Sequence, residues 1–344
     1  MKNKILVIVF FVVFLIYSCS EKNRKYLVFK NVQHVECISI PYSDILGISM
    51  QLLKKDSLLL INDFYGDSLI HVFDVKNQVQ LSKLVAKGNG PNEFISPLGI
   101  YMTDDKLFIN ERQSFRLFSF PLDSLLSNNK NIKKEFTITK SNIIFPLSDS
   151  LFISSGYGEG QKRFTLYGKG GAKICEFGEY PTYWHEETKF SNKVRSFFHQ
   201  TFFEKHPSQK KFIAYTGHIL GIYSYELTRE IPVLEKEFLL SDYKYSFVDN
   251  DQILTADGTE GIEHGIIRVA CSSNYIYILY NPNKKGKDIT LPYQIKILDW
   301  DGNPIKLIAV NKQISCFVID ETEKKGYIVA RDPEDTLMYF NLEN

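Results

Sequence analysis

The sequence predicts an all-β fold, namely a six-bladed β-propeller whose blades are four-stranded antiparallel sheets. Three observations support this prediction: strand-like runs recur six times, aromatic and β-branched residues are abundant, and no long amphipathic helix competes with them. The 344 residues are 44% hydrophobic and 24% charged, which excludes both a disordered chain and a membrane protein with many spans.

The recurring unit is an apolar strand, a short polar break and a second strand that ends in an aromatic and a polar residue. Equivalent positions are 48, 44, 61, 64 and 52 residues apart, about 54 on average, which suits blades with variable loops. A seven-bladed ring and two separate β domains are the alternatives. The first strands of the six copies read SLLLIND after Asp56, KLFINE after Asp105, SLFISS after Asp149, KFIAYT after Lys210, YIYILY after Asn274 and GYIVAR after Lys325.

Two segments lie outside the six repeated units. The strand-like residues 26–40 precede the first copy, and we expect them to complete the last blade and so join the two ends of the chain. Residues 186–205 lie in a long insertion and are expected to form a short helix or another ordered structure. The 48 aromatic residues recur within the copies, which indicates packing between blades, whereas Trp184 stands apart and is a candidate for ligand contact.

The N-terminus has the pattern of an export signal. Lys2 and Lys4 precede an apolar run at residues 5–17, which is too short to cross a bilayer comfortably. The following residues, Leu-Ile-Tyr-Ser-Cys, resemble the lipobox of bacterial lipoproteins. This resemblance implies cleavage before Cys19 and attachment of lipid to that cysteine; an ordinary signal peptide is the alternative.

The predicted organisation is therefore a lipoprotein signal peptide at 1–18, a lipidated tether at 19–25 and a propeller at 26–344. Ser20 is not the aspartate that retains many lipoproteins at the inner membrane, so an outer-membrane location in the cell envelope is expected. The leaflet, and hence a periplasmic or cell-surface position, stays open. The predicted contact with the membrane is through the N-terminal lipid.

Charge and cysteine content exclude further classes. The chain has 41 basic and 40 acidic residues, so nothing favours a nucleic-acid partner. The four other cysteines are widely spaced and form no CxxC pair, which is typical of small buried side chains rather than a metal site. These are Cys37, Cys175, Cys271 and Cys316.

The segment Lys-Gly-Asn-Gly-Pro-Asn-Glu-Phe at 87–94 is the most specific motif. It resembles the Gly-Arg/Lys-Gly-Pro-Gly-Glu-Phe signature of TolB-like six-bladed β-propeller lipoproteins of Bacteroidota, and phrases along the whole mature chain fit that family. Asn89 and Asn92 depart from the pattern, because a basic residue and a glycine are usual there. Asparagine tolerates a tight turn, but any contact made by the basic residue is lost.

Such a segment joins two blades on the propeller face that commonly binds ligands. Glu93 either points into the mouth of the ring or accepts hydrogen bonds from amides of its own turn, and Phe94 is expected to plug between blades. A connection without any ligand is the alternative for this segment. The candidate ligand-face residues are Lys87, Asn89, Glu93, Asn110, Arg112, Trp184 and His185.

Two functions remain open, and no catalytic residue is assigned. The first is a monomeric binding or scaffold module for an envelope protein, a peptide or a glycan, without a cofactor. The second is a metal-dependent, lactonase-like propeller in which Asp63, Glu93 and Asn110 hold a divalent cation. His185 and His199, beside Glu186 and Glu187, are either a metal or acid–base site or a polar surface loop.

Overall fold

The computed structural model describes residues 27–342, apart from 43–45, 91–92, 127–131, 139–140, 157–161, 228–230, 250–253 and 332–333. The predicted signal peptide, Cys19 and the tether at 19–25 lie outside the described residues. Within the described part of the chain, no helix is long and apolar enough to cross a membrane.

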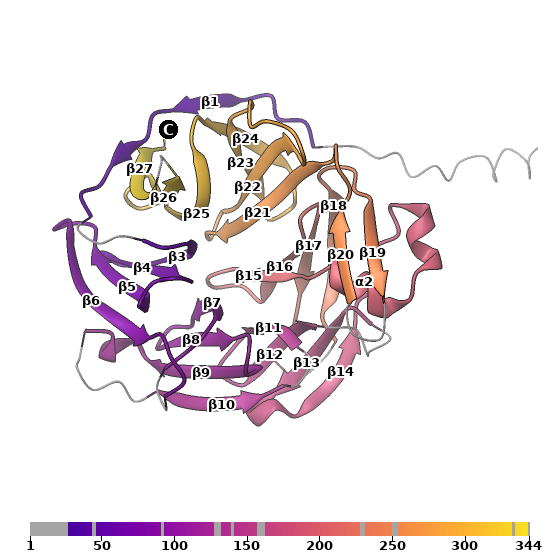
Figure 1. Cartoon of the computed structure of the whole chain (residues 1–344), viewed down its shortest axis with the longest axis horizontal. Coiled ribbons are helices and arrows are strands. Elements are labelled where there is room, and N and C mark those ends of the chain that lie inside the picture. Colours follow the sequence, from indigo (N-terminus) through magenta and orange to yellow (C-terminus); the bar gives the residue numbers. More distant parts are fainter. Residues whose placement is uncertain are drawn as a thin grey trace, which may run out of the picture.

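Six sheets are arranged as blades around a central axis, which confirms the predicted propeller (Figure 1). Neighbouring strands within each blade are antiparallel, and the first strand of a blade lies nearest the axis. Blade one contains β3 (Ser49–Lys55), β4 (Leu58–Asp63), β5 (Ser68–Asp74) and β6 (Val79–Ala86). Blade two contains β7 (Pro97–Met102), β8 (Lys106–Glu111), β9 (Arg116–Pro121) and β10 (Lys133–Thr137). Blade three contains β11 (Ser141–Pro146), β12 (Leu151–Gly156), β13 (Phe164–Gly168) and β14 (Lys173–Phe177).

The second half of the ring repeats the pattern with longer connections. Blade four contains β15 (Phe202–Lys205), β16 (Lys211–Tyr215), β17 (Ile219–Ser224) and β18 (Val233–Leu239). Blade five contains β21 (Glu263–Cys271), β22 (Tyr275–Lys284), β23 (Tyr293–Asp299) and β24 (Pro304–Val310). Blade six contains β25 (Gln313–Asp320), β26 (Lys325–Arg331) and β27 (Asp335–Asn341). The six sequence copies are the second and third strands of these blades.

The N-terminal segment closes the ring, as expected. β2 (Ile38–Ser39) pairs antiparallel with β27 and supplies the fourth strand of blade six. The preceding β1 (Val32–Val35) runs parallel to β24 and adds a fifth strand to blade five. The first part of the domain therefore holds the last two blades together (Figure 1).

Apolar side chains pack between neighbouring blades. One cluster joins blades one and two, another joins blades five and six, and a third joins blades six and one. The largest is aromatic, and Phe108 of β8 meets Phe152 of β12 edge to face with ring centroids 6.0 Å apart. Because each blade is apolar on both faces, closure of the ring removes both faces from water.

Two insertions form a small cap beside blade four. The first carries the 3₁₀ helix η3 (His185–Lys189) and α2 (Asn192–Phe198), whose N-terminal amide at Val194 is capped by the Ser191 hydroxyl. The second is a hairpin of β19 (Tyr245–Asp249) and β20 (Leu254–Gly258), which packs on α2. The predicted short helix is confirmed, whereas the hairpin is a finding of the structure.

The cysteines lie in these strands and their connections. Cys316 is buried and the other three are half-buried. The four described cysteines are not joined by disulfides.

Candidate binding face and its pocket

One end of the propeller carries both the connections between blades and the turns between second and third strands. The connection after β6 meets the β4–β5 turn, where the Lys87 amide donates to the Asp67 carbonyl at 3.0 Å. The connection before β21 meets the β22–β23 turn, where the Lys285 amide donates to the Ile262 carbonyl at 2.8 Å. We call this end the loop face. By chain order it carries the β6–β7 connection with Lys87, Asn89 and Glu93, the end of β8 and the turn after it with Asn110 and Arg112, and the β14–β15 connection with Trp184 and His185.

The described residues of the signature at 87–94, on either side of 91–92, are held close together on the loop face. The Gly88 amide donates to the Phe94 carbonyl at 3.0 Å, and the Glu93 carboxylate accepts the Gly90 amide at 2.8 Å. A Cβ added to Gly88 would lie 2.0 Å from the Glu93 carboxylate, so any larger residue there would displace the Glu93 side chain from this position. Of the two orientations predicted for Glu93, the structure has the one in which it bonds its own turn.

Phe94 plugs the space between blades one and two. Its buried ring meets Phe118 edge to face with centroids 4.6 Å apart. Lys87 is exposed, and its ammonium lies 5.3 Å from the Tyr65 ring centroid. Asn89 is exposed as well. The apolar part of the signature therefore joins blades, and its polar part faces solvent.

Asp63 is a buried hub of backbone hydrogen bonds. Its carboxylate accepts the amides of Gly47 and Ile48 at 2.8 and 3.0 Å, which fixes the entry into β3. It also accepts the amides of Tyr65 and Gly66 at 3.2 and 3.1 Å. Both carboxylate oxygens are thus occupied by the protein's own amides.

The charge on Asp63 is stabilised by this environment. Burial alone would raise its pKa, but the His71 ring, with Nε2 3.6 Å from the carboxylate, and the surrounding amides outweigh burial. The pKa of Asp63 is lowered to about 2. The carboxylate therefore remains ionised at neutral pH and serves the fold.

Blade two repeats part of this arrangement. The Glu111 carboxylate accepts the Ser96 amide at 3.1 Å, and the buried Asn110 accepts the amide of Ile144 in blade three at 3.1 Å. Arg112 is exposed, and its amide donates to the Ser96 carbonyl.

All three predicted metal ligands use their side-chain oxygens for backbone amides: Asp63, Glu93 and Asn110. Among the residues that the structure describes, no three His, Cys, Asp or Glu side chains are close enough together to hold a metal ion. In this arrangement, Asp63, Glu93 and Asn110 hold the backbone in place at the ends of the blades.

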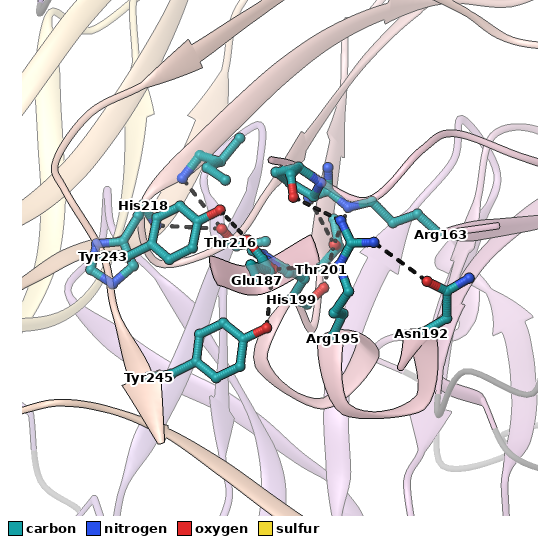
Figure 2. Close-up of polar contacts among 12 residues, drawn as sticks. Arg163, Glu187, Asn192, Arg195, His199, Thr201, Thr216, His218, Tyr243 and Tyr245 are labelled. Carbon is teal, nitrogen blue, oxygen red and sulfur yellow. Dashed lines mark hydrogen bonds and ion pairs between the residues drawn. The ribbon is translucent and has the colours of Figure 1, made fainter. Parts of the chain in front are cut away.

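The cap contains a second polar cluster, centred on the fully buried Glu187 (Figure 2). Its carboxylate contacts His199 Nε2, accepts the Tyr243 hydroxyl at 2.6 Å and accepts the Tyr245 hydroxyl at 3.1 Å. Arg195 Nε lies 3.8 Å away. The carboxylate therefore links η3, the end of α2 and the start of the hairpin.

The negative charge of Glu187 is stabilised by hydrogen-bond donors of the protein in place of water. Burial would raise the pKa of Glu187, but His199, Tyr243 and Arg195 together lower it. Burial lowers the pKa of His199, which favours the neutral ring, and a neutral ring in contact with the Glu187 carboxylate donates through Nε2–H. Its Nδ1 then has no hydrogen-bond partner among the described residues.

The sequence placed His199 near His185, but its partner is Glu187. His185 and Glu186 are exposed on η3, while Glu187 points inward. Trp184 is half-buried and packs against Tyr245 with ring centroids 5.3 Å apart. Trp184 therefore supports the cap, and nothing in the local sequence indicates that Glu187 pairs with tyrosines more than 50 residues away.

A pocket of about 320 Å³ lies on the loop face where blade five meets blade six. One wall is the end of the β22–β23 connection, and the other is the β24–β25 connection with the end of β26. The sequence did not indicate this site, because its walls come from three separate segments. The lining residues are Ile289, Thr290, Leu291, Pro292, Tyr293, Asn311, Lys312, Gln313 and Arg331.

A buried asparagine holds the first wall in place. The Asn283 carbonyl oxygen accepts the amides of Thr290 and Leu291, both at 2.9 Å, and its side-chain amide donates to the Leu291 carbonyl at 2.9 Å. Asn281 supports Asn283 through a 2.8 Å hydrogen bond and donates to the Tyr293 hydroxyl at 3.2 Å. The pocket is therefore ordered before any ligand arrives.

Comparison with solved structures supports the fold. The chain is similar to a crystallised protein of Bacteroides fragilis NCTC 9343, described there as an inferred exported protein (13% identity, 91% of this chain and 99% of that chain, TM-score 0.55). It is also similar to the WD40 repeats of RRP9 (7%, 90% and 100%, TM-score 0.52) and to Raptor of Chaetomium thermophilum (10%, 89% and 29%, TM-score 0.51). At these identities the likeness concerns the fold alone.

Sequence comparison is more specific. None of the curated proteins compared with the chain matches it. The model of the family described as TolB-like 6-blade propeller-like matches residues 29–322, which is most of the chain and includes the signature at 87–94. Together with the six observed blades, this match confirms the resemblance seen in the motif: the chain belongs to the TolB-like six-bladed propeller family.

Proposed function

We propose that the chain is an outer-membrane lipoprotein whose propeller is a binding module, with the loop face as its binding surface. The observation that carries this proposal is the preformed pocket between blades five and six, whereas the conspicuous carboxylates of blade one and its connection to blade two are already occupied by backbone amides. A ligand would bind a concave surface that is already formed. A catalysed reaction would need free acidic or basic side chains, and few are available there. The partner is an envelope protein, a peptide or a glycan.

The metal-dependent hydrolase is the weaker candidate for the same reason. Asp63 and Asn110 would each have to release a backbone amide before they could bind a cation, and a buried unpaired amide costs about 1–3 kcal/mol. Metal analysis of the purified, tag-free protein tests this candidate. Calcium or zinc at one equivalent, together with a calcium-dependent rise in unfolding temperature, would favour the hydrolase over the binding module.

The position of the binding surface can be tested by photo-crosslinking in the native envelope. A photoreactive phenylalanine analogue at Asn89 or Ile289 samples the loop face, and the same analogue at Asp104, in the β7–β8 turn, samples the opposite end. We expect adducts of defined mass from the two loop-face positions and not from Asp104. Equal labelling at both ends, or labelling at Asp104 alone, would contradict the proposed surface.

Anchoring through Cys19 has its own test. The lipobox-like sequence motivates this part of the proposal, and the Bacteroides fragilis protein that is described as exported by inference has the same fold. We expect Cys19→Ser to move the protein from the membrane fraction to the soluble fraction and to abolish the acyl mass on the N-terminal peptide. Cys37→Ser, which alters a half-buried cysteine of the propeller, is the control and should remain acylated. Acylation that persists in Cys19→Ser would refute the anchor.

A further inference from the structure

We propose that the pocket between blades five and six binds the free C-terminal carboxylate of a peptide whose last side chain is aliphatic. This inference rests on the proposed function and names the class of ligand. It combines three properties of the pocket, namely cationic side chains, an ordered aliphatic wall and amide side chains near both.

The charge of the lining favours an anionic group. Lys312 and Arg331 line the pocket, and among the described residues no aspartate or glutamate lines it. Arg331 Nε lies 3.3 Å from the carboxylate of Asp335, whose other oxygen accepts the Ser49 amide at 3.0 Å. Asp335 therefore fixes the stem of Arg331.

The head of Arg331 is available to a ligand. Its side chain is 51% exposed, and its two terminal nitrogens make no hydrogen bond or ion pair with the described residues. A guanidinium held at Nε presents these two nitrogens as a fork, which matches the two oxygens of a carboxylate. Lys312 adds positive charge to the same pocket.

The opposite wall favours an aliphatic side chain. Ile289 and Leu291 are 47% and 51% exposed, although Asn283 fixes the backbone on which they stand. Exposed aliphatic groups on an ordered wall lose no further backbone freedom when a ligand covers them. Burial of a matching side chain would remove apolar surface from water on both partners.

The same wall disfavours a sugar or a nucleobase. Tyr293, which among the described lining residues is the single aromatic one, is 8% exposed, and its hydroxyl accepts a hydrogen bond from Asn281. Its ring therefore offers little face for stacking. By contrast, the amides of Asn311 and Gln313 are suited to a peptide backbone, and 320 Å³ is enough for the end of a peptide rather than a long segment.

The test is fluorescence anisotropy with two labelled probes, fluorescein-Gly-Gly-Ala-Leu with a free C-terminus and the same peptide as its C-terminal amide. We expect saturable binding of the acid and at least tenfold weaker binding of the amide. Arg331→Gln should weaken binding of the acid at least tenfold, and Leu291→Ser should weaken it severalfold. Lys76→Gln also removes one positive charge, at an exposed residue of the β5–β6 turn on the opposite end of the propeller, and should leave binding unchanged.

Three results would overturn the assignment: equal affinity for acid and amide, no binding of either probe, or displacement of the acid by inorganic phosphate as effective as by unlabelled peptide. Repeating the envelope crosslinking with Arg331→Gln separates this inference from the proposed function. If both probes fail and the adducts persist, the loop face still binds a partner and only the peptide assignment is lost. If Asn89 and Ile289 give no adducts, the proposed surface itself fails.

Discussion

At the scale of single residues, buried polar side chains of the loop face and the cap mostly bond other groups of the same chain. Asp63 shows this with four amides, and Glu187 shows it in the cap with one histidine and two tyrosines. His218 is a further case, because it is 7% exposed and its Nδ1 lies 2.9 Å from the Ser241 hydroxyl. Buried polar groups of this kind make stability depend on their protonation.

His218 predicts a loss of stability in mild acid. Burial, with nearby His199, Lys285 and His264, lowers the pKa of His218 from 6.5 to about 4. The unfolded chain therefore binds a proton more readily than the native protein, so the contribution is complete above pH 6.5 and declines as the pH falls towards 4. Between pH 7 and 5 this group should cost about 2 kcal/mol of unfolding free energy.

Urea denaturation at a series of pH values measures this loss. His218→Asn keeps a hydrogen-bonding group near Ser241 but cannot titrate, so its slope over pH 7 to 5 should be smaller by roughly that amount. Identical slopes for the variant and the wild type would show that His218 does not carry the effect.

At the scale of elements, the connections between blades also insert side chains between neighbouring blades. The turn at 87–94 ends in Phe94, whose buried ring belongs to the apolar cluster between blades one and two. Gly265 in blade five makes another tight contact, since a Cβ there would lie 2.0 Å from the Gly217 carbonyl oxygen of blade four. Side-chain and backbone contacts together thus fix the position of one blade against the next.

The wedge at Phe94 predicts a large loss on truncation. Phe94→Ala should lower the free energy of unfolding by about 3–5 kcal/mol, because it leaves a cavity between two blades. Phe247→Ala is the matched control, since that ring is 39% exposed on the cap hairpin and should cost less than about 1 kcal/mol. Urea denaturation of both variants measures the difference, and similar losses would contradict the role of Phe94 as a wedge.

At the scale of the whole molecule, the ring is closed by residues far apart in the chain. Ile38 pairs with Tyr339, and the Ile40 amide donates to the Leu337 carbonyl at 2.9 Å. The first described strands thus join blades whose other strands come last in the sequence. Because β2 pairs with β27, the ring can close only after the chain of the last blade is available for pairing.

The closing segment offers a matched pair of variants. Ile40 is 5% exposed between blades six and one, whereas Ile38, two residues earlier, is 45% exposed. We expect Ile40→Ala to lower the free energy of unfolding by about 2–4 kcal/mol and Ile38→Ala by less than about 1 kcal/mol. Unfolding followed by tryptophan fluorescence and by circular dichroism measures both, and equal losses would show that closure does not depend on the buried face.

The blades could be predicted because each copy repeats a local pattern of alternating apolar residues and turns. The turn at 87–94 was also predictable, since glycine, proline and phenylalanine have distinct local effects. The cap cluster and the pocket could not be predicted, because they depend on contacts between residues that lie far apart in the sequence. The pairing of Glu187 with Tyr243 crosses two insertions, and the pocket joins residues 289–293 to 311–313 and Arg331.

The parallel pairing of β1 with β24 also has a mechanical consequence. Any tension that reaches the domain from its N-terminal end enters through β1 (Val32–Val35), which pairs with residues 307–310 along its whole length. A pull along β1 loads these hydrogen bonds together in shear, whereas a pull across the strand would peel them apart one after another. The N-terminal end of the described domain is therefore held by hydrogen bonds that resist a pull along β1 together.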